Sequence, residues 1–152
     1  MGFDEMFSSV IIHDFDENGN GTFEPSEVRK LEQGAFSNLR NFDYFTLIKI
    51  SGQDFKVEYI RDFSSSIQAN SIIYDFFVPC HVTGISTFKE VRILFCDKEN
   101  YTYFSFIQDK PVQFENSTMF DFQYEISQDK EHPDFFCRYV KQVTLRFRKK
   151  NG

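Results

Sequence analysis

Twelve consecutive residues near the N terminus carry the oxygen atoms of a calcium-binding loop. The run is Asp-Glu-Asn-Gly-Asn-Gly-Thr-Phe-Glu-Pro-Ser-Glu, residues 16 to 27. Calcium is a hard cation that takes about six to eight oxygen ligands, and an EF-hand loop supplies them from positions 1, 3, 5, 7, 9 and 12 around a glycine at position 6. With Gly21 at position 6, an oxygen donor falls on every liganding position: Asp16, Asn18, Asn20, the Thr22 carbonyl, Glu24 and Glu27. We therefore predict one Ca²⁺ site, with Glu27 as the bidentate last ligand and Glu24 acting through a water.

A second frame for the loop begins at Asp14 and fails at its last position. In that frame the twelfth residue is Pro25, which has no side-chain oxygen to close the coordination shell. The frame that begins at Asp16 is therefore preferred, and we expect Asp14 to be a flanking acid at the end of the preceding helix.

The number of charged ligands limits the expected affinity. Asp16, Glu24 and Glu27 carry charge, whereas Asn18 and Asn20 are neutral. We expect a dissociation constant on the order of 10⁻⁶ to 10⁻³ M, a range that suits an extracellular structural ion better than a cytosolic buffer. The alternative interpretation is an acidic turn that binds no ion, because short runs of Asp, Asn and Gly are common in turns.

Helical periodicity surrounds the loop on both sides. Before it, apolar residues recur at the three- and four-residue intervals of an amphipathic helix: Phe3, Met6, Phe7, Val10 and Ile11. After it, Pro25 suits the first position of a helix. The same intervals then continue through Val28, Leu31, Ala35, Leu39 and Phe42. Helix, loop and helix over residues 1–42 complete the EF-hand-like motif.

Beyond Phe42 the hydrophobic period changes to two, which indicates β-strands. The expected strands lie at 44–50, 55–59, 72–78, 91–95, 101–107, 120–126 and 143–147. Strands with no helices between them favour an antiparallel sandwich. We expect an α+β fold in which the helical hairpin, 1–42, packs on an antiparallel β-sandwich of about seven strands, 43–150, as one folded unit, because two short helices cannot bury an apolar stripe alone.

Composition excludes several classes of protein. The chain has 152 residues, 41% of them hydrophobic, and a net charge of −6. This composition is typical of a globular domain, and the negative charge argues against nucleic acid as a partner. The chain has no apolar run of the roughly 20 residues that a transmembrane helix needs, so we expect no membrane span. We interpret the basic residues Arg146 and Arg148 as a solvated strand face.

The cysteines and histidines give weaker signals. The chain has three cysteines, Cys80, Cys96 and Cys137, which allow one disulfide and a free thiol. An odd number does not indicate a disulfide framework, and we prefer the interpretation that all three are buried, unreactive thiols. A transition-metal site built from His81, His132 and a cysteine is an alternative. The sequence has no H-E-x-x-H, G-x-S-x-G, Walker or G-x-G-x-x-G motif, and we therefore do not expect an enzyme.

Several spaced motifs resemble a bacterial family. They are residues 3–8, 14–16, 35–39, 44–46, 61–64 and 74–79. In this order they are similar to the DUF1007 family over roughly residues 3–107, and the resemblance fades beyond Ile107. Members are described as periplasmic components of uncharacterised ABC-type transport systems, often encoded near nickel or cobalt transporters. The signal peptide and His-Pro-His strand that usually precede the first motif are not present before Phe3.

The resemblance implies a periplasmic protein with a membrane transporter complex as a possible partner. Combined with the loop, it suggests a non-enzymatic calcium-binding protein that is an accessory component of a metal transport system. The alternative is a transition-metal or small-solute-binding protein that delivers its ligand to an ABC-type transporter. Because EF-hands usually work in pairs and only one loop is present, Phe23 must contact either a second molecule, in a homodimer, or the same chain's sandwich.

Overall fold

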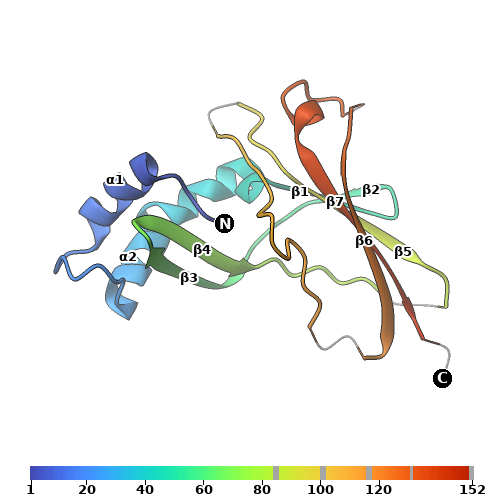
Figure 1. The fold of residues 1–152 in the computed structure, drawn as a ribbon, viewed down its shortest axis with the longest axis horizontal. Helices are drawn as coiled ribbons and strands as arrows, with labels where there is room; N and C mark the ends of the chain where they lie inside the picture. Colours follow the sequence, from blue (N-terminus) through green and yellow to red (C-terminus); the bar gives the residue numbers. More distant parts are fainter. Residues whose placement is uncertain (84–85, 100–101, 116–117, 131, 151–152) are drawn as a thin grey trace. The chain divides into compact units, whose positions relative to one another are not determined.

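The computed structural model describes residues 1–83, 86–99, 102–115, 118–130 and 132–150. It is an α+β protein with two antiparallel sheets, as the sequence predicts. Its contacts divide the chain into two units, Met1–Asn41 with Glu58–Cys80, and Phe42–Val57 with His81–Gly152. Figure 1 shows the helices α1 and α2 with strands β3 and β4, and the strands of the larger sheet.

The first unit contains the two helices that the sequence predicts around the loop. Helix α1 spans Glu5–Phe15, and the Asp4 carboxylate caps it by accepting a hydrogen bond of 2.8 Å from the Phe7 N–H. Helix α2 spans Pro25–Gly34 with proline in its first turn. The sequence predicts that the second helix continues to Phe42. In the structure α2 ends at Gly34, and a 3₁₀ segment, η1, follows at Phe36–Phe45.

The prediction of which residues of α1 face the protein core is wrong in part. Met6, Phe7 and Val10 are exposed, whereas Ser8 and Ile11 are buried. The Ser8 hydroxyl accepts a hydrogen bond of 2.9 Å from the Ile72 N–H, so a polar residue on α1 satisfies a buried backbone group of β4. This contact turns Ser8, and not Met6, toward the strand.

Strands β3, Arg61–Gln68, and β4, Ser71–Phe77, form an antiparallel hairpin in the same unit. The turn between them has positive φ at Ala69 and Asn70, the backbone conformation of a tight hairpin. The first residues of the chain lie along β4, where the Phe3 N–H donates to the Ile72 carbonyl over 3.1 Å. The β3 strand was not expected from the sequence.

An aromatic cluster forms the centre of this unit. Phe36 is 2% exposed and stacks on Phe63 with ring centroids 4.0 Å apart. Tyr74 meets both Phe36 and Phe63 edge to face, and Phe3 contacts Tyr74 at 4.9 Å. Burial raises the pKa of Tyr74 to about 12. Residues from the N terminus, η1 and both strands thus share one core.

The second unit is built on a five-stranded antiparallel sheet in the order β2-β1-β5-β7-β6. Its strands are β1, Thr46–Ile50; β2, Gln53–Phe55; β5, Lys89–Phe95; β6, Phe120–Gln128; and β7, Lys141–Lys149. A 3₁₀ turn, η2, lies at Cys137–Tyr139 before β7. Of the expected strand 101–107, Tyr101 lies outside the described residues and 102–107 is not in a strand.

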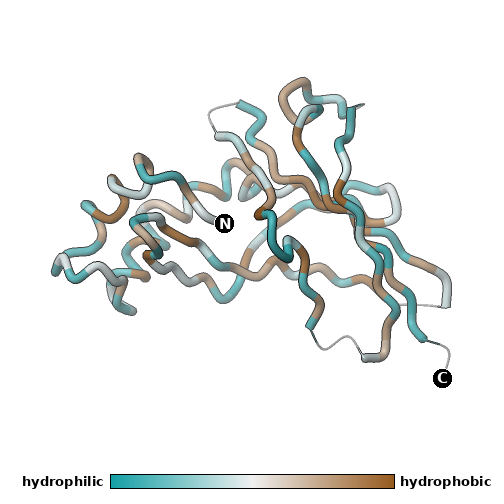
Figure 2. Tube along the Cα trace, in the orientation of Figure 1, coloured by the Kyte–Doolittle hydropathy of each residue, from teal (hydrophilic) through white to brown (hydrophobic). Residues whose placement is uncertain are grey.

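The two faces of this sheet differ in character, because paired residues on neighbouring strands share a face. One face carries the aligned apolar residues Phe55, Ile48, Ile93, Val143 and Ile126. The other carries Asp54, Lys49, Arg92, Thr144 and Glu125 in the next register position. Figure 2 shows hydrophobic and hydrophilic residues recurring along these strands.

The strands form one five-stranded and one two-stranded antiparallel sheet, and the predicted seven-stranded sandwich over 43–150 is not confirmed. Five strands form the larger sheet, while β3 and β4 pair with each other and share a core with the helices. Helical turns are also not confined to the N terminus, since η2 lies near the other end of the chain. Alternation alone cannot show which strands share a sheet.

A disulfide joins Cys96 to Cys137, and Cys80 is free. The preferred interpretation of unreactive thiols is thus wrong for two of the three cysteines. Cys137 is fully buried, and Cys96 is 4% exposed beside Leu94, Leu47 and Val140. The bond ties the end of β5 to η2 across 41 residues of sequence. Burial raises the pKa of the Cys80 thiol.

Phe36→Ala should lower the free energy of unfolding by about 3–5 kcal/mol, because it leaves a cavity among Phe63, Phe76 and Tyr74. Urea denaturation followed by circular dichroism measures the loss. Met6→Ala is the matched control, since Met6 is 80% exposed and should change stability by less than about 0.5 kcal/mol. Equal stability losses in the two variants would contradict the described core.

Replacing both bridged cysteines, Cys96→Ala with Cys137→Ala, should cost about 3–4 kcal/mol of stability, because the bond closes a long loop in the unfolded chain. Thermal unfolding of the oxidised parent, the double variant and a Cys80→Ala control measures the difference. The disulfide pairing would be contradicted if the double variant had the same melting temperature as the parent. It would also be contradicted if Cys80→Ala lowered the melting temperature as much as the double variant does.

Candidate metal centre

The loop 16–27 lies where the sequence places it, between the end of α1 and the first turn of α2. Helix α1 ends at Phe15, so that Asp16 is its C-cap, and Asp14 lies in its last turn as predicted. Helix α2 begins at Pro25, which puts Glu24 at the N-cap and Glu27 in the first turn. The first and last liganding positions therefore belong to the two helix ends.

Asp16 organises the turn that follows α1. Its two carboxylate oxygens accept hydrogen bonds from the N–H groups of Asn20, at 3.2 Å, and Gly21, at 2.9 Å. Gly21 has φ of +78°, and no atom lies within 4 Å of where its Cβ would stand. Backbone conformation, and not lack of space, is thus the reason for glycine at the sixth position.

The middle of the loop is a network of amides around one carboxylate. The Asn18 amide donates to Glu24 Oε2 over 2.9 Å, and the Asn20 amide donates to Glu24 Oε1 over 3.0 Å. The side-chain oxygen of Asn20, Oδ1, accepts hydrogen bonds from the N–H and the hydroxyl of Thr22, at 2.8 and 2.7 Å. All of these residues are exposed, so the network lies at the surface.

Glu27 joins the beginning of the loop to its end. Its Oε1 accepts a hydrogen bond of 2.8 Å from the Glu17 N–H, and its Oε2 accepts one of 2.9 Å from the Glu24 N–H. The side chain belongs to a residue that is only 2% exposed. A buried carboxylate needs such partners, because an ionised group without them is strongly disfavoured. Glu17 itself forms an exposed ion pair with Lys30.

Hydrogen bonds therefore connect all six predicted ligand residues, but the carboxylates do not converge. In the described part of the chain, no three His, Cys, Asp or Glu side chains gather in a cluster that could hold a metal ion. The donor chemistry nevertheless fits calcium, since every side-chain ligand offers oxygen and two of them are neutral amides. To bind an ion, the Asn18 and Asn20 amides must break these bonds to Glu24 and turn their oxygens, and not their nitrogens, toward the ion.

The alternative transition-metal residues are not brought together. The disulfide removes the thiols of Cys96 and Cys137, and the His132 Nδ1 accepts a hydrogen bond of 3.1 Å from the Asp134 N–H. His81 is exposed. Over the described ranges these residues form no metal cluster.

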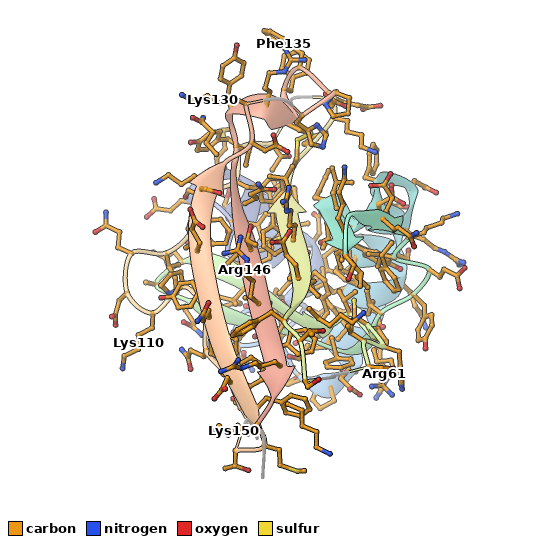
Figure 3. The ribbon with its side chains drawn as sticks, turned by 90° about the vertical axis from the view of Figure 1, so that its right-hand side faces the viewer. Arg61, Lys110, Lys130, Phe135, Arg146 and Lys150 are labelled. Atoms are coloured by element: carbon orange, nitrogen blue, oxygen red, sulfur yellow. A yellow bond between two sulfur atoms is a disulfide. The ribbon has the colours of Figure 1, made fainter. Side chains whose placement is uncertain are left out.

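The basic residues near the C terminus belong to a charged sheet face, as predicted. Glu90 accepts hydrogen bonds from the Nε atoms of Arg92, at 2.7 Å, and Arg146, at 3.0 Å. Burial raises the pKa of Glu90, but the two guanidinium groups outweigh that effect and hold it below its ordinary value. Arg148 pairs with Asp121 in the same way. Figure 3 shows Arg146 midway along β7.

The sequence of the chain matches the model of a known protein family. The family model described as "Protein of unknown function (DUF1007)" matches residues 2–144. The chain belongs to the DUF1007 family. The match includes the loop, the β3–β4 hairpin and the larger sheet as far as Thr144 in β7, and it extends well beyond Ile107, where the resemblance in the sequence fades.

One uncharacterised bacterial protein is similar to most of the chain. The "Uncharacterized 15.5 kDa protein in trpE 3'region" of Spirochaeta aurantia is 29% identical over 102 residues, which cover 67% of this chain and 72% of the relative. No solved structure matches the chain. Among the described residues of this DUF1007 protein, no helix is long and apolar enough to cross a membrane, in agreement with the expectation from the sequence.

Glu27→Gln should destabilise the protein in the presence of chelator by about 1–3 kcal/mol, because an amide offers one acceptor oxygen where two backbone N–H groups need one each. Urea denaturation in EGTA measures this loss. Glu17→Gln is the matched control, since it removes only an exposed ion pair worth less than about 1 kcal/mol. If the two substitutions had equal effects, Glu27 would not hold the loop closed.

Proposed function

We propose that this DUF1007 protein is a non-enzymatic calcium-binding protein with one structural Ca²⁺ in the loop 16–27. The observation that carries the proposal is the buried Glu27, whose carboxylate links the start of the loop to its end from the first turn of α2. The oxygen donors Asp16, Asn18, Asn20, Thr22, Glu24 and Glu27 occur in the order and spacing of an EF-hand. A bound Ca²⁺ would supply a divalent positive charge that crosslinks these oxygens.

The chain's own residues supply the rest of the site. Asp16 already holds the turn by accepting from Asn20 and Gly21, so the backbone at the sixth position is set before any ion binds. Glu24 draws the two asparagine side chains to one side of the loop. The preset backbone turn at Asp16 lowers the conformational cost of binding, whereas the two asparagine amides must still turn to present their oxygens. Asp16 at the end of α1 and Glu27 in the first turn of α2 would hold the ion between the two helices, so its role would be structural.

A periplasmic location is part of the proposal. The Cys96–Cys137 disulfide supports it, because such bonds persist in oxidising compartments and are rare in the cytosol. The expected calcium affinity also suits a compartment outside the cytosol. From the family resemblance we propose that the protein is an accessory component of a metal transport system and works with a membrane transporter complex.

A small-solute-binding role is the second candidate, and one observation favours it. A cavity of about 660 Å³ lies on the charged face of the larger sheet, a size within the roughly 300–1,000 Å³ range of small-molecule sites. Its walls carry groups of both signs, among them Lys49, Lys56, Arg92, Asp54 and Asp134. A charged solute carried to an ABC-type transporter would suit such a site.

Association of two copies through the loop remains a proposal. Phe23, at the eighth position, is half-buried, and paired EF-hands place this residue at their shared strand. A homodimer would cover it further. Sedimentation velocity with and without calcium decides between a dimer and a monomer in which Phe23 packs within its own chain.

Calcium should raise the melting temperature, because a ligand that binds only the folded protein stabilises it by about 2.7 kcal/mol at 100 times its Kd. We expect calorimetric titration of chelator-treated protein to give one site with a Kd on the order of 10⁻⁶ to 10⁻³ M. Glu27→Gln should abolish the binding heat, whereas Glu17→Gln, a change of the same type at a position that is not a ligand, should retain it. Identical melts in EGTA and in excess calcium would overturn the assignment.

A further inference from the structure

A small aromatic hollow lies in the second unit, between the loop that follows β5 and the turn η2. Its volume is about 150 Å³. Three aromatic residues, Tyr103, Phe136 and Tyr139, line it together with Cys96, Asp97, Thr102 and Val140. We call these seven residues the aromatic hollow. Neither the calcium loop nor the large cavity includes any of them.

The rings of the hollow are unusually exposed. Tyr103 is 83% exposed, Tyr139 60% and Phe136 42%. Phe135 extends the surface, because its ring meets those of Phe136 and Tyr139 edge to face with centroids 5.5 and 5.6 Å away. Figure 3 shows Phe135 at the extreme end of the unit, beyond the strand ends. Aromatic groups left in solvent around a hollow mark a binding surface more often than a packing defect.

Asp97 gives the hollow its charge. The residue is 5% exposed, and its carboxylate oxygens accept hydrogen bonds of 2.9 Å from the Glu99 and Thr102 N–H groups. These bonds fix the carboxylate within the chain that forms one wall. Asp97 is among the residues that line the hollow, and a carboxylate near aromatic rings adds to the negative potential of the ring faces.

The disulfide keeps the two walls together. Cys96 precedes Asp97 in one wall, and Cys137 lies between Phe136 and Tyr139 in the other. Behind the bond, Leu94, Leu47 and Val140 form an apolar base. A covalent link therefore joins the two chain segments that carry the walls of the hollow.

We propose that the aromatic hollow binds a small organic cation of the quaternary ammonium type. Such cations are held by aromatic faces, which attract positive charge without requiring hydrogen bonds, and Asp97 adds a compensating charge. The chemistry disfavours the other classes of ligand: an anion meets Asp97, a divalent metal finds one carboxylate where several oxygens are needed, and an uncharged apolar molecule gains nothing from the carboxylate. A trimethylammonium group suits the limited volume.

The experiment titrates the full-length, oxidised protein with choline and follows the backbone amide signals of Thr102, Tyr103 and Tyr139 by NMR. The expected result is saturable shifts at these positions, with no such shifts from sodium chloride or from the uncharged analogue in which tert-butyl replaces trimethylammonium. Tyr103→Leu and Tyr139→Leu should each weaken binding by roughly fivefold to thirtyfold, as loss of one cation–π contact requires. Tyr124→Leu, which removes an exposed tyrosine of β6 outside the hollow, is the matched control.

Asp97→Asn tests the charge, with its melting temperature checked because Asp97 also ties the loop. If Asp97→Asn does not fold, the variants Tyr103→Leu and Tyr139→Leu decide whether the proposal holds. Flotation with phosphatidylcholine and phosphatidylglycerol vesicles distinguishes the two sources of the ligand: choline binding alone indicates a free solute, and selective binding to phosphatidylcholine indicates a lipid headgroup. Absence of both, equal binding of the uncharged analogue, or choline binding unchanged in both tyrosine variants would overturn the proposal.

Discussion

The first unit depends on a carboxylate that is buried at the junction of two helices. Glu27 is almost inaccessible to solvent, and an ionised side chain in that position needs strong partners in the protein. It finds them in two backbone N–H groups, one from the start of the loop and one from the N-cap of α2. The loop must close for both bonds to form, so the burial of one charge fixes the separation of the two helix ends. The exposed Asn and Glu24 side chains can then be arranged by weaker bonds.

The helices that present this loop are themselves held by distant parts of the chain. Neither α1 nor α2 is long enough to be stable alone in water. Phe36 supplies the contact with β3 and β4, and Ser8 supplies a polar contact between α1 and the Ile72 backbone. Because the core is aromatic, its packing constrains ring orientation as well as volume. The geometry of the candidate metal centre therefore depends on a hairpin that begins more than thirty residues after the loop ends.

Some features of this fold could be predicted from the sequence and others could not. The difference lies in how far apart in the sequence the interacting residues are. The segment between α1 and α2 could be located because its candidate ligands lie within twelve residues, and the predicted glycine at position 6, Gly21, has positive φ. Strand β3 could not be predicted, because its residues Ser64, Ser65 and Ser66 give no alternation of polar and apolar side chains. The buried face of α1 was misjudged because Ser8 is polar, and its role becomes visible only beside β4. Pairing Cys96 with Cys137 required knowing that β5 and η2 meet.

The two units use different crosslinks for the same physical task. In the second unit a disulfide joins the two walls of the aromatic hollow, and in the first the proposed ion would hold α1 to α2. Each crosslink persists only under particular conditions, since a disulfide needs an oxidising compartment and a weak calcium site needs free calcium well above cytosolic levels. The space outside the cytosol satisfies both conditions at once, whereas the cytosol satisfies neither. The proposed location therefore follows from the chemistry of both crosslinks, and the resemblance to exported proteins is a separate argument for it.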